Sequence, residues 1–387
     1  MVSISHYSGR EQSYVKHVLL EQYLDALVHK TASAYPHIVY VDGFAGPWQS
    51  SSEQFQDTSF GIALQALRRA KSTWKAAARE VKMSAILVEK DPAAFAHLEA
   101  LPPKFPDVSV VPLNGSFVTL IPTILRNIPK DAFAFFLLDP KGWRIPLKAI
   151  QPLLAHPKSE VLFNFMFEFI NRAASMDDPA IFGGLNELLP LGDWRDKLAQ
   201  AETSNQRKAI LIEAFSYNLA IAGQYKHTCE TTILRPDRDR PLYSLFYGTR
   251  HDIGLEVFRD CQVRALEAQT RAVKKVDSAE RRSGQTELFE SLHEMSPNQA
   301  LAFLAEERVK ARDTLLRLAP HRSSPISYGE LWPQVLARHV VRRTDINQLA
   351  GKMKKDGSLV FPDWEPRRRV PQPGYRLFRA ENTLTSN

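Results

Sequence analysis

Residues 39–48 read VYVDGFAGPW, and the fold prediction starts from them. An apolar stretch with strong strand propensity runs here into an acid followed by two glycines. Glycine lets a backbone approach a ligand closely, and open α/β sheets bind nucleotides beyond the carboxyl ends of their strands. The stretch therefore predicts a first strand and a cofactor-binding turn, although a purely structural strand-to-helix turn uses the same residues. The predicted cofactor-binding residues of this turn are Asp42, Gly43, Phe44, Ala45 and Gly46.

Short β-rich runs alternate with helical stretches on either side of this turn, behind a leading helix at 14–30. Such alternation predicts a parallel sheet with crossover helices. The parallel strands are predicted at 37–44, 84–89, 108–113, 132–139 and 160–167. Two later runs, 225–234 and 242–249, flank the turn-forming sequence RPDRDRP and predict an antiparallel hairpin. The fold class is thus α/β, a Rossmann-like seven-stranded sheet of methyltransferase type.

The second and third strands are predicted to end in further ligand-binding groups. The second strand ends at Glu89, where a carboxylate can accept both hydroxyls of a ribose. The alternative is a solvated strand end, with Asp91 capping the next helix ahead of Pro92. After the third strand, Asn114 and Ser116 are the candidates for an adenine contact.

The fourth strand runs into DPKGW, at residues 139–143. An acid and a proline in such a turn can orient a target amine, and an aromatic ring can stack on a flipped base. We therefore predict catalytic roles for Asp139, Pro140 and Trp143. The alternative is a simple chain turn with the tryptophan in the core. Polar residues interleaved with aromatics follow the fifth strand and are expected at the substrate entrance, namely Asn164, Glu168, Asn171 and Arg172.

The chain has 387 residues, more than one core usually serves, so two domains are expected. We predict an α/β domain at 1–273, a linker or loop at 274–297 and a basic helical, winged-helix-like domain at 298–387. Its helices are expected at 329–337 and 344–354, the second capped by Thr344, and its strands at 358–361 and 375–379.

Charge is concentrated in this second domain. Residues 308–379 hold 16 Lys/Arg against 6 Asp/Glu, whereas the whole chain has a net charge of +7. Cations on a helix and an adjacent wing would neutralise phosphates, and flanking Trp364 and Tyr375 could stack on bases or support the wing. The alternative is an ordinary solvated surface. The predicted nucleic-acid-binding residues are Lys352, Lys354, Lys355, Arg367, Arg368 and Arg369.

The two cysteines, Cys229 and Cys261, have no neighbours at metal-ligand spacing, so neither a disulfide framework nor a metal site is expected. Neither lies in a candidate loop, which argues against methylation of a pyrimidine carbon through a thiolate. We see no signal peptide or membrane-spanning run and expect a cytoplasmic protein.

The chain resembles the bacterial and archaeal three-Cys-motif partner protein family. The resemblance covers nearly the whole chain, through YVDGFAGP, LVEKDP, LNGSF, LLDPKGW, NFMFEFINR, LYSLFYGTRHDIGLEVF and the basic C-terminal module. Ser116 and Lys141 depart from the family pattern, which tends to have Asp and an aromatic residue there. The resemblance implies a methyltransferase-type domain that binds S-adenosylmethionine and works with a separately encoded three-cysteine partner.

Two functions remain open at this point. The first is a nucleic-acid methyltransferase, in which Asp139 orients the target amine and Trp143 stacks. The second is a non-catalytic recognition subunit that binds nucleic acid and the partner. A small-molecule methyltransferase is a third reading, but it leaves the basic module unexplained.

Overall fold

The computed structural model describes residues 11–46, 50, 55, 57–140, 142, 144–174, 176, 178–234, 241–283 and 297–380. The chain divides into two compact units, Met1–His251 and Asp252–Asn387, which are described separately. The sequence-based boundary at 273 lies inside helix α10 (Asp252–Ser283), which groups with the second unit because it packs on α11 and α12. Where an independently folding domain begins stays a prediction.

Unit 1 is built on one seven-stranded sheet with the strand order β3-β2-β1-β4-β5-β7-β6. The first five strands run parallel, and β7 is antiparallel to both β5 and β6. The predicted strand inventory, with its parallel series and its hairpin, is therefore confirmed. The strands are β1 His37–Asp42, β2 Lys82–Glu89, β3 Ser109–Asn114, β4 Ala132–Leu138, β5 Ser159–Phe165, β6 His227–Leu234 and β7 Pro241–Thr249. The turn predicted between β6 and β7 lies outside the described residues, apart from Pro241.

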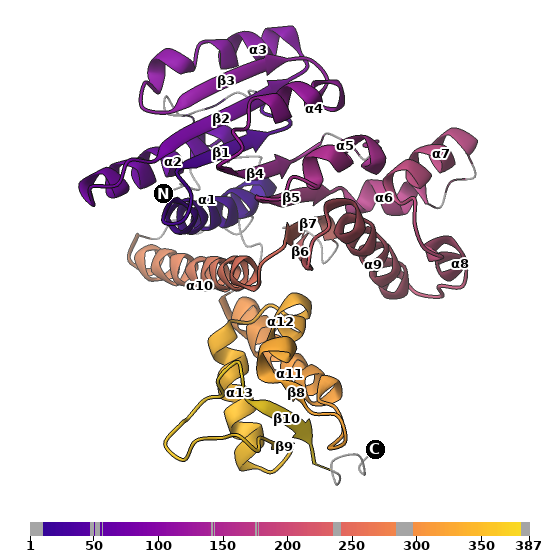
Figure 1. Ribbon diagram of the computed structural model, residues 1–387. Helices are drawn as coiled ribbons and strands as arrows, with labels where there is room; N and C mark the ends of the chain where they lie inside the picture. Colours follow the sequence, from indigo (N-terminus) through magenta and orange to yellow (C-terminus); the bar gives the residue numbers. More distant parts are fainter. Residues whose placement is uncertain are drawn as a thin grey trace. The chain divides into compact units, whose positions relative to one another are not determined.

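Helices cover both faces of this sheet (Figure 1), as the apolar runs in the central strands require. Every residue of β4 and β5 is buried. Helices α4, α5 and α9 pack on one face, and α1 and α2 on the other. The helices of unit 1 are α1 Glu11–Ala32, α2 Ser59–Ala76, α3 Pro92–Glu99, the short 3₁₀ helix η2 Pro102–Lys104, α4 Phe117–Arg126, α5 Leu147–Leu154, α6 Phe167–Ala173, α7 Pro179–Leu188, α8 Trp194–Ala199 and α9 Ser204–Gly223.

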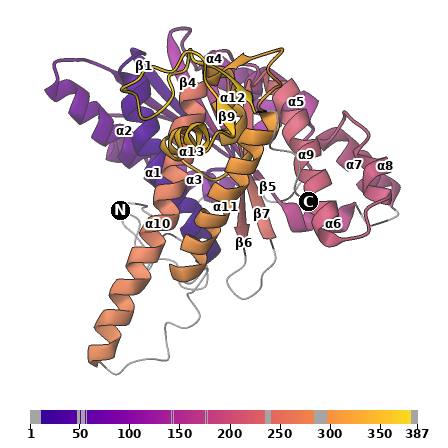
Figure 2. The same ribbon diagram turned by 90° about the horizontal axis from the view of Figure 1, so that it is seen from below.

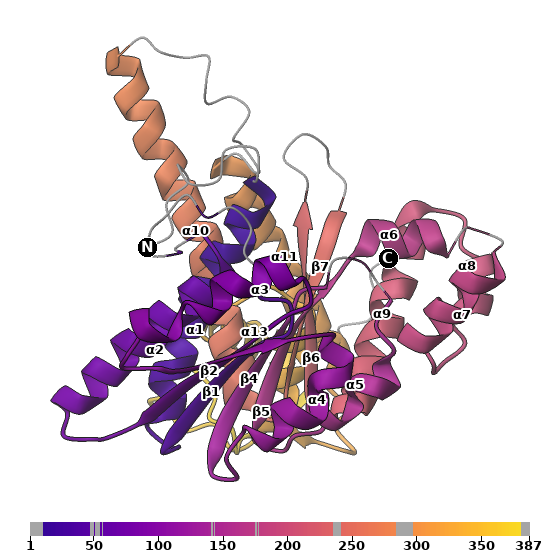
Figure 3. The same cartoon turned by 90° about the horizontal axis from the view of Figure 1, so that it is seen from above.

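Local signals explain several of these helix ends. Asp91 is the N-cap of α3, as predicted, and its Oδ1 accepts a hydrogen bond from the Ala94 amide at 2.8 Å. Thr203 and Gln206 form a capping box at the start of α9. Between β5 and β6 the chain inserts α6, α7, α8 and α9, which form a group of helices at one side of the sheet (Figure 3).

Unit 2 has the order α10, α11, β8, α12, α13, β9, β10, and its three strands pair antiparallel in the order β8-β10-β9 (Figures 1 and 2). The remaining elements are α11 Pro297–Leu318, β8 Ile326–Ser327, α12 Tyr328–Arg338, α13 Arg343–Lys355, β9 Leu359–Val360 and β10 Arg376–Arg379. Ser327 and Glu330 form a capping box at the start of α12. The two helices and the two C-terminal strands lie where the sequence predicts them.

Two local predictions differ from the structure. The first ten residues of the predicted linker, 274–283, are helical in α10, because this polar run is rich in Lys, Ala, Glu and Arg, which favour helix. The rest of that linker, apart from residue 297, lies outside the described residues. Thr344 does not cap α13: the N-cap is Arg342, whose amide donates to Asp345 Oδ2 at 2.9 Å. No helix among the described residues is long and apolar enough to cross a membrane.

Candidate functional site

The turn after β1 is held by the buried carboxylate of Asp42. Its Oδ1 accepts the Phe44 amide at 3.1 Å, and its Oδ2 accepts the hydroxyls of Tyr40 at 3.0 Å and Ser59 at 2.6 Å. Burial raises the pKa of Asp42 to about 6, although these three donors act in the opposite direction. Asp42 therefore fixes the turn to strand β1 and to the start of α2.

The same turn also contacts the ends of the neighbouring strands. The Gly43 amide donates to the Leu137 carbonyl in β4 at 3.0 Å, and the Ala45 amide donates to the Val88 carbonyl in β2 at 2.8 Å. A Cβ added at Gly46 would lie 2.3 Å from Glu89 Oε2. Only glycine fits this position while Glu89 keeps its place. The structure thus brings the predicted turn and the predicted ribose-binding acid together.

Glu89 and the end of β3 form the next part of this edge. Glu89 is partly exposed, and its Oε1 accepts the Asp91 amide at 2.7 Å. Asn114 Nδ2 and the Gly115 amide both donate to the Glu89 carbonyl at 3.0 Å. Ser116 begins α4 without a capping hydrogen bond from its side chain, and it is exposed. Asn114 is therefore committed to the backbone of β2, whereas the Ser116 hydroxyl faces solvent.

Asp139, after β4, is engaged on both of its carboxylate oxygens. Lys16 of α1 forms an ion pair with Oδ2, and Asn164 Nδ2 donates to Oδ1 at 2.5 Å. Burial raises the pKa of Asp139, but Lys16, Asn164 and His17 outweigh burial and hold the pKa below its ordinary value. Asp139 is therefore an anion at neutral pH.

The other residues predicted near Asp139 differ in their burial and in their contacts. Pro140 is buried, and its carbonyl accepts the Gly142 amide at 3.0 Å. Trp143 lies outside the described residues, as does the side chain of Glu168. Asn164 is buried beside Asp139. Asn171 instead accepts a hydrogen bond from Arg207 of α9 at 3.2 Å, so it joins α6 to α9.

The polar groups that contact Asp42 and Asp139 include residues that the sequence prediction missed. Lys16, Tyr40 and Ser59 come from α1, β1 and the first turn of α2. Tyr40 and Ser59 stand in an apolar strand and at a helix start, where nothing distinguishes them from ordinary core and helix residues. Lys16 stands among the apolar residues of α1, and a single helix pattern does not reveal which strand end a lysine reaches.

The predicted nucleic-acid-binding residues lie on α13 and on the loop between β9 and β10. Lys352, Lys354 and Lys355 are exposed near the carboxyl end of α13, and Arg367, Arg368 and Arg369 are exposed in the loop. A Cβ added at Gly351 would lie 2.7 Å from the Arg369 carbonyl oxygen. The backbone of α13 and the backbone of the loop, which are separate in the sequence, therefore lie against each other beside the two groups of cations.

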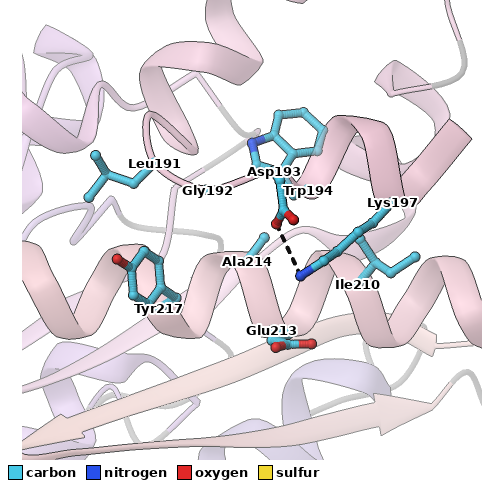
Figure 4. A pocket seen from close by; sticks show the side chains of 9 residues that line it. All are labelled: Leu191, Gly192, Asp193, Trp194, Lys197, Ile210, Glu213, Ala214 and Tyr217. Carbon is cyan, nitrogen blue, oxygen red and sulfur yellow. Dashed lines mark ion pairs between the residues drawn. The ribbon is translucent and has the colours of Figure 1, made fainter.

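A surface cavity of about 380 Å³ lies elsewhere in unit 1, between α8 and α9 (Figure 4). Asp193 and Lys197 pair across one side of it at 3.0 Å, and the ring of Tyr217 lies on another. None of the predicted site residues lines this cavity. It belongs to the helical insertion and is separate from the strand ends.

The strand order and the acids at the strand ends define a Rossmann-like fold of methyltransferase type. No protein-family model matches the sequence, and a comparison with curated proteins finds no match. Among solved structures, a loganic acid methyltransferase with SAH is 10% identical, with a TM-score of 0.27, over 65% of this chain and 97% of that chain. A likeness of this size carries no argument about activity. The resemblance to the three-Cys-motif partner family stays a prediction.

Proposed function

We propose that this chain is an S-adenosylmethionine-dependent methyltransferase that acts on nucleic acid, together with a separately encoded three-cysteine partner. The contact between Gly46 and Glu89 supports this proposal most directly. It joins the glycine turn after β1 to the acid that ends β2, at the edge where open α/β sheets bind nucleotide ligands. In the proposed site the turn would approach the ligand closely, and the acid would accept the hydroxyls of its ribose.

The groups at this edge suit a nucleoside. Within the described residues, Glu89 Oε2 makes no hydrogen bond, so it can accept a ribose hydroxyl while Oε1 stays on Asp91. The exposed Ser116 hydroxyl offers a donor and an acceptor for adenine. S-adenosylmethionine would supply a methyl group on a sulfonium centre. The residues of the chain would bind, orient and shield the reactants, and positioning of this kind accounts for much of a transfer rate.

Unit 2 supports a nucleic-acid acceptor. Its order α11, β8, α12, α13, β9, β10, with β10 central in the sheet, fits the proposal of a winged helix. The cations of α13 and of the adjacent loop are exposed, and the backbones that carry them are in close contact at Gly351 and Arg369. Clustered Lys and Arg side chains supply the sequence-independent affinity for phosphates.

The test is transfer of a labelled methyl group. The purified chain, with and without its partner, is incubated with labelled S-adenosylmethionine and a mixture of DNA and RNA. The proposal expects label in nucleic acid, and loss of that label in Asp139→Ala and Glu89→Ala. An absence of label in nucleic acid with the partner present would contradict it.

One observation favours a second function, the non-catalytic recognition subunit. Both oxygens of Asp139 are already occupied by donors from the chain itself, Lys16 and Asn164. In a recognition subunit that cluster would be structural. Asp139→Ala would then leave nucleic-acid binding and partner function unchanged, provided that the variant folds.

A further inference from the structure

We propose that unit 2 binds the phosphate backbone of duplex nucleic acid and does not stack on bases. The proposed binding surface, called the basic surface below, consists of Lys352, Lys354, Lys355, Arg367 and Arg369. The inference deepens the proposed function, because it takes the nucleic-acid acceptor from there and adds its strandedness and the mode of recognition.

The basic surface is held together by close packing between α13 and the loop that follows β9. Gly351 allows the Arg369 carbonyl to approach, as described above. The ammonium of Lys354 lies 4.9 Å from the ring centroid of Trp364, and Trp364 Nε1 donates to the Arg368 carbonyl at 3.1 Å. The loop backbone is thus fixed beside α13, and its arginines are presented together with the lysines.

Some cations of unit 2 are already paired with acidic residues of the same unit. Arg368 pairs with Glu365 at 3.1 Å, so we exclude it from the basic surface. At the amino end of α13, Arg342 pairs with Asp260 and Glu267, and Arg343 pairs with Glu256. The five residues of the basic surface make no ion pair within the described part of the chain. These five cations, at the carboxyl end of α13 and in the loop, are therefore available to a ligand.

The aromatic residues of this region are packed against each other. Trp364 lies 5.2 Å from Phe361 and 5.8 Å from Tyr375, measured between ring centroids. Phe361 is only 5% exposed and Tyr375 only 6%. One face of Trp364 also carries Lys354. Trp364 itself is half-buried. These contacts favour the second of the two roles predicted for Trp364 and Tyr375, support of the wing, over stacking on bases.

The packing of these aromatic rings bears on whether unit 2 prefers duplex or single-stranded nucleic acid. Proteins that bind single strands gain affinity from stacking the bases on aromatic side chains. Trp364 is half-buried, and its ring already contacts Lys354, Phe361 and Tyr375. We therefore expect affinity to come mainly from phosphates, whose charge density is higher on a duplex. Phosphate contacts position a protein but do not read sequence. We expect tighter binding to duplexes than to single strands, with no preference for sequence.

Fluorescence anisotropy of the full chain tests this inference. The probes are labelled DNA and RNA duplexes of two unrelated sequences, with the matching single strands. We expect duplexes to bind at least about fivefold tighter, and the slope of log K against log salt to approach about −4.5 for five neutralised phosphates. Equal or tighter binding of single strands, or a dependence on sequence above about tenfold, would overturn the inference. The DNA and RNA arms show which duplex is preferred.

Charge-neutralising variants locate the contact. Lys352→Gln/Lys355→Gln and Arg367→Gln/Arg369→Gln should each weaken duplex binding and reduce the salt slope by about 2. The matched control is Lys310→Gln, because Lys310 on α11 is paired with Glu306 and Glu307. An unchanged slope in both double variants, or an equal loss in the control, would overturn the assignment. Thermal unfolding confirms that each variant is folded.

The outcome separates this inference from the proposed methyl transfer. Duplex binding without S-adenosylmethionine binding would leave the inference standing and remove the enzyme. Cofactor binding without nucleic-acid binding would do the reverse. Trp364→Leu adds an independent arm: it should lower stability, whereas a selective loss of single-strand affinity would show that bases do stack there.

Discussion

Lys16 of α1 and Asp139 at the end of β4 form an ion pair at the sheet edge where the parallel strands end. The pair leaves the Asp139 carboxylate anionic but already balanced by a cation. An amine gains positive charge as it attacks a methyl group, and a carboxylate can stabilise that charge. Asp139 can do so fully only if Lys16 moves away, so Lys16 bears directly on the catalytic prediction for Asp139.

The ion pair predicts a cost for removing Lys16. In Lys16→Ala, Asp139 keeps Asn164 but loses its counter-charge. Both side chains of the pair are mostly but not fully buried, so we expect a loss of about 2 kcal/mol in the free energy of unfolding at pH 7. The pKa of Asp139 should rise as well. Urea unfolding measures the first effect, and Lys30→Ala, an exposed lysine on the same helix, is the control. Equal stability of both variants would show that the pair contributes nothing.

Asp42 predicts a specific pH dependence. Its pKa in the folded protein is raised to about 6 from an unfolded value of 3.8, so its contribution to stability is full below pH 3.8 and is lost as the pH rises through about 6. A shift of about two pKa units changes the free energy of unfolding by about 3 kcal/mol across this pH range. The wild type should therefore lose stability relative to Asp42→Asn between pH 4 and pH 7. Parallel stability profiles for the two proteins would show that the pKa is not raised.

Gly46 predicts a loss of ligand binding without a loss of folding. In Gly46→Ala the new methyl group would displace the Glu89 carboxylate, the far end of a flexible side chain. We expect the free energy of unfolding to change by less than about 1 kcal/mol. The affinity for S-adenosylmethionine should fall at least about tenfold. Gly183→Ala, in α7, is the control, because a Cβ there meets nothing within 4 Å. Undiminished affinity in Gly46→Ala would remove this turn from the site.

Arg259 predicts a large effect on unit 2. The side chain is only 1% exposed, and it donates to the carbonyls of Leu336 at 3.0 Å and Ala337 at 2.9 Å, at the end of α12. Arg259→Met would leave these carbonyls without that donor, so we expect the free energy of unfolding to fall by about 3 kcal/mol. Arg264→Met, at an exposed position on the same helix, should cost under about 0.5 kcal/mol. Thermal unfolding compares the two variants.

The strand ends could be predicted because each apolar run in the sequence stops at a polar group, as in Asp42, Glu89 and Asp139. Parallel strands then bring those groups to one edge. The partners of these groups could not be predicted, because Lys16 reaches Asp139 from a helix far away in the chain. The sequence also left two roles open for Trp364, stacking on bases or supporting the wing, because it does not show which rings pack together. The packing of Trp364 against Phe361 and Tyr375 favours the second role.

Calorimetric titration with S-adenosylmethionine tests the central claim, that the ends of β1 and β2 form a cofactor site. The wild type is compared with Glu89→Ala and with Glu99→Ala, an exposed acid on α3, as the control. We predict binding in the micromolar range or tighter, lost in Glu89→Ala and kept in Glu99→Ala. No detectable heat with the folded wild type, or undiminished binding in Glu89→Ala, would contradict the account.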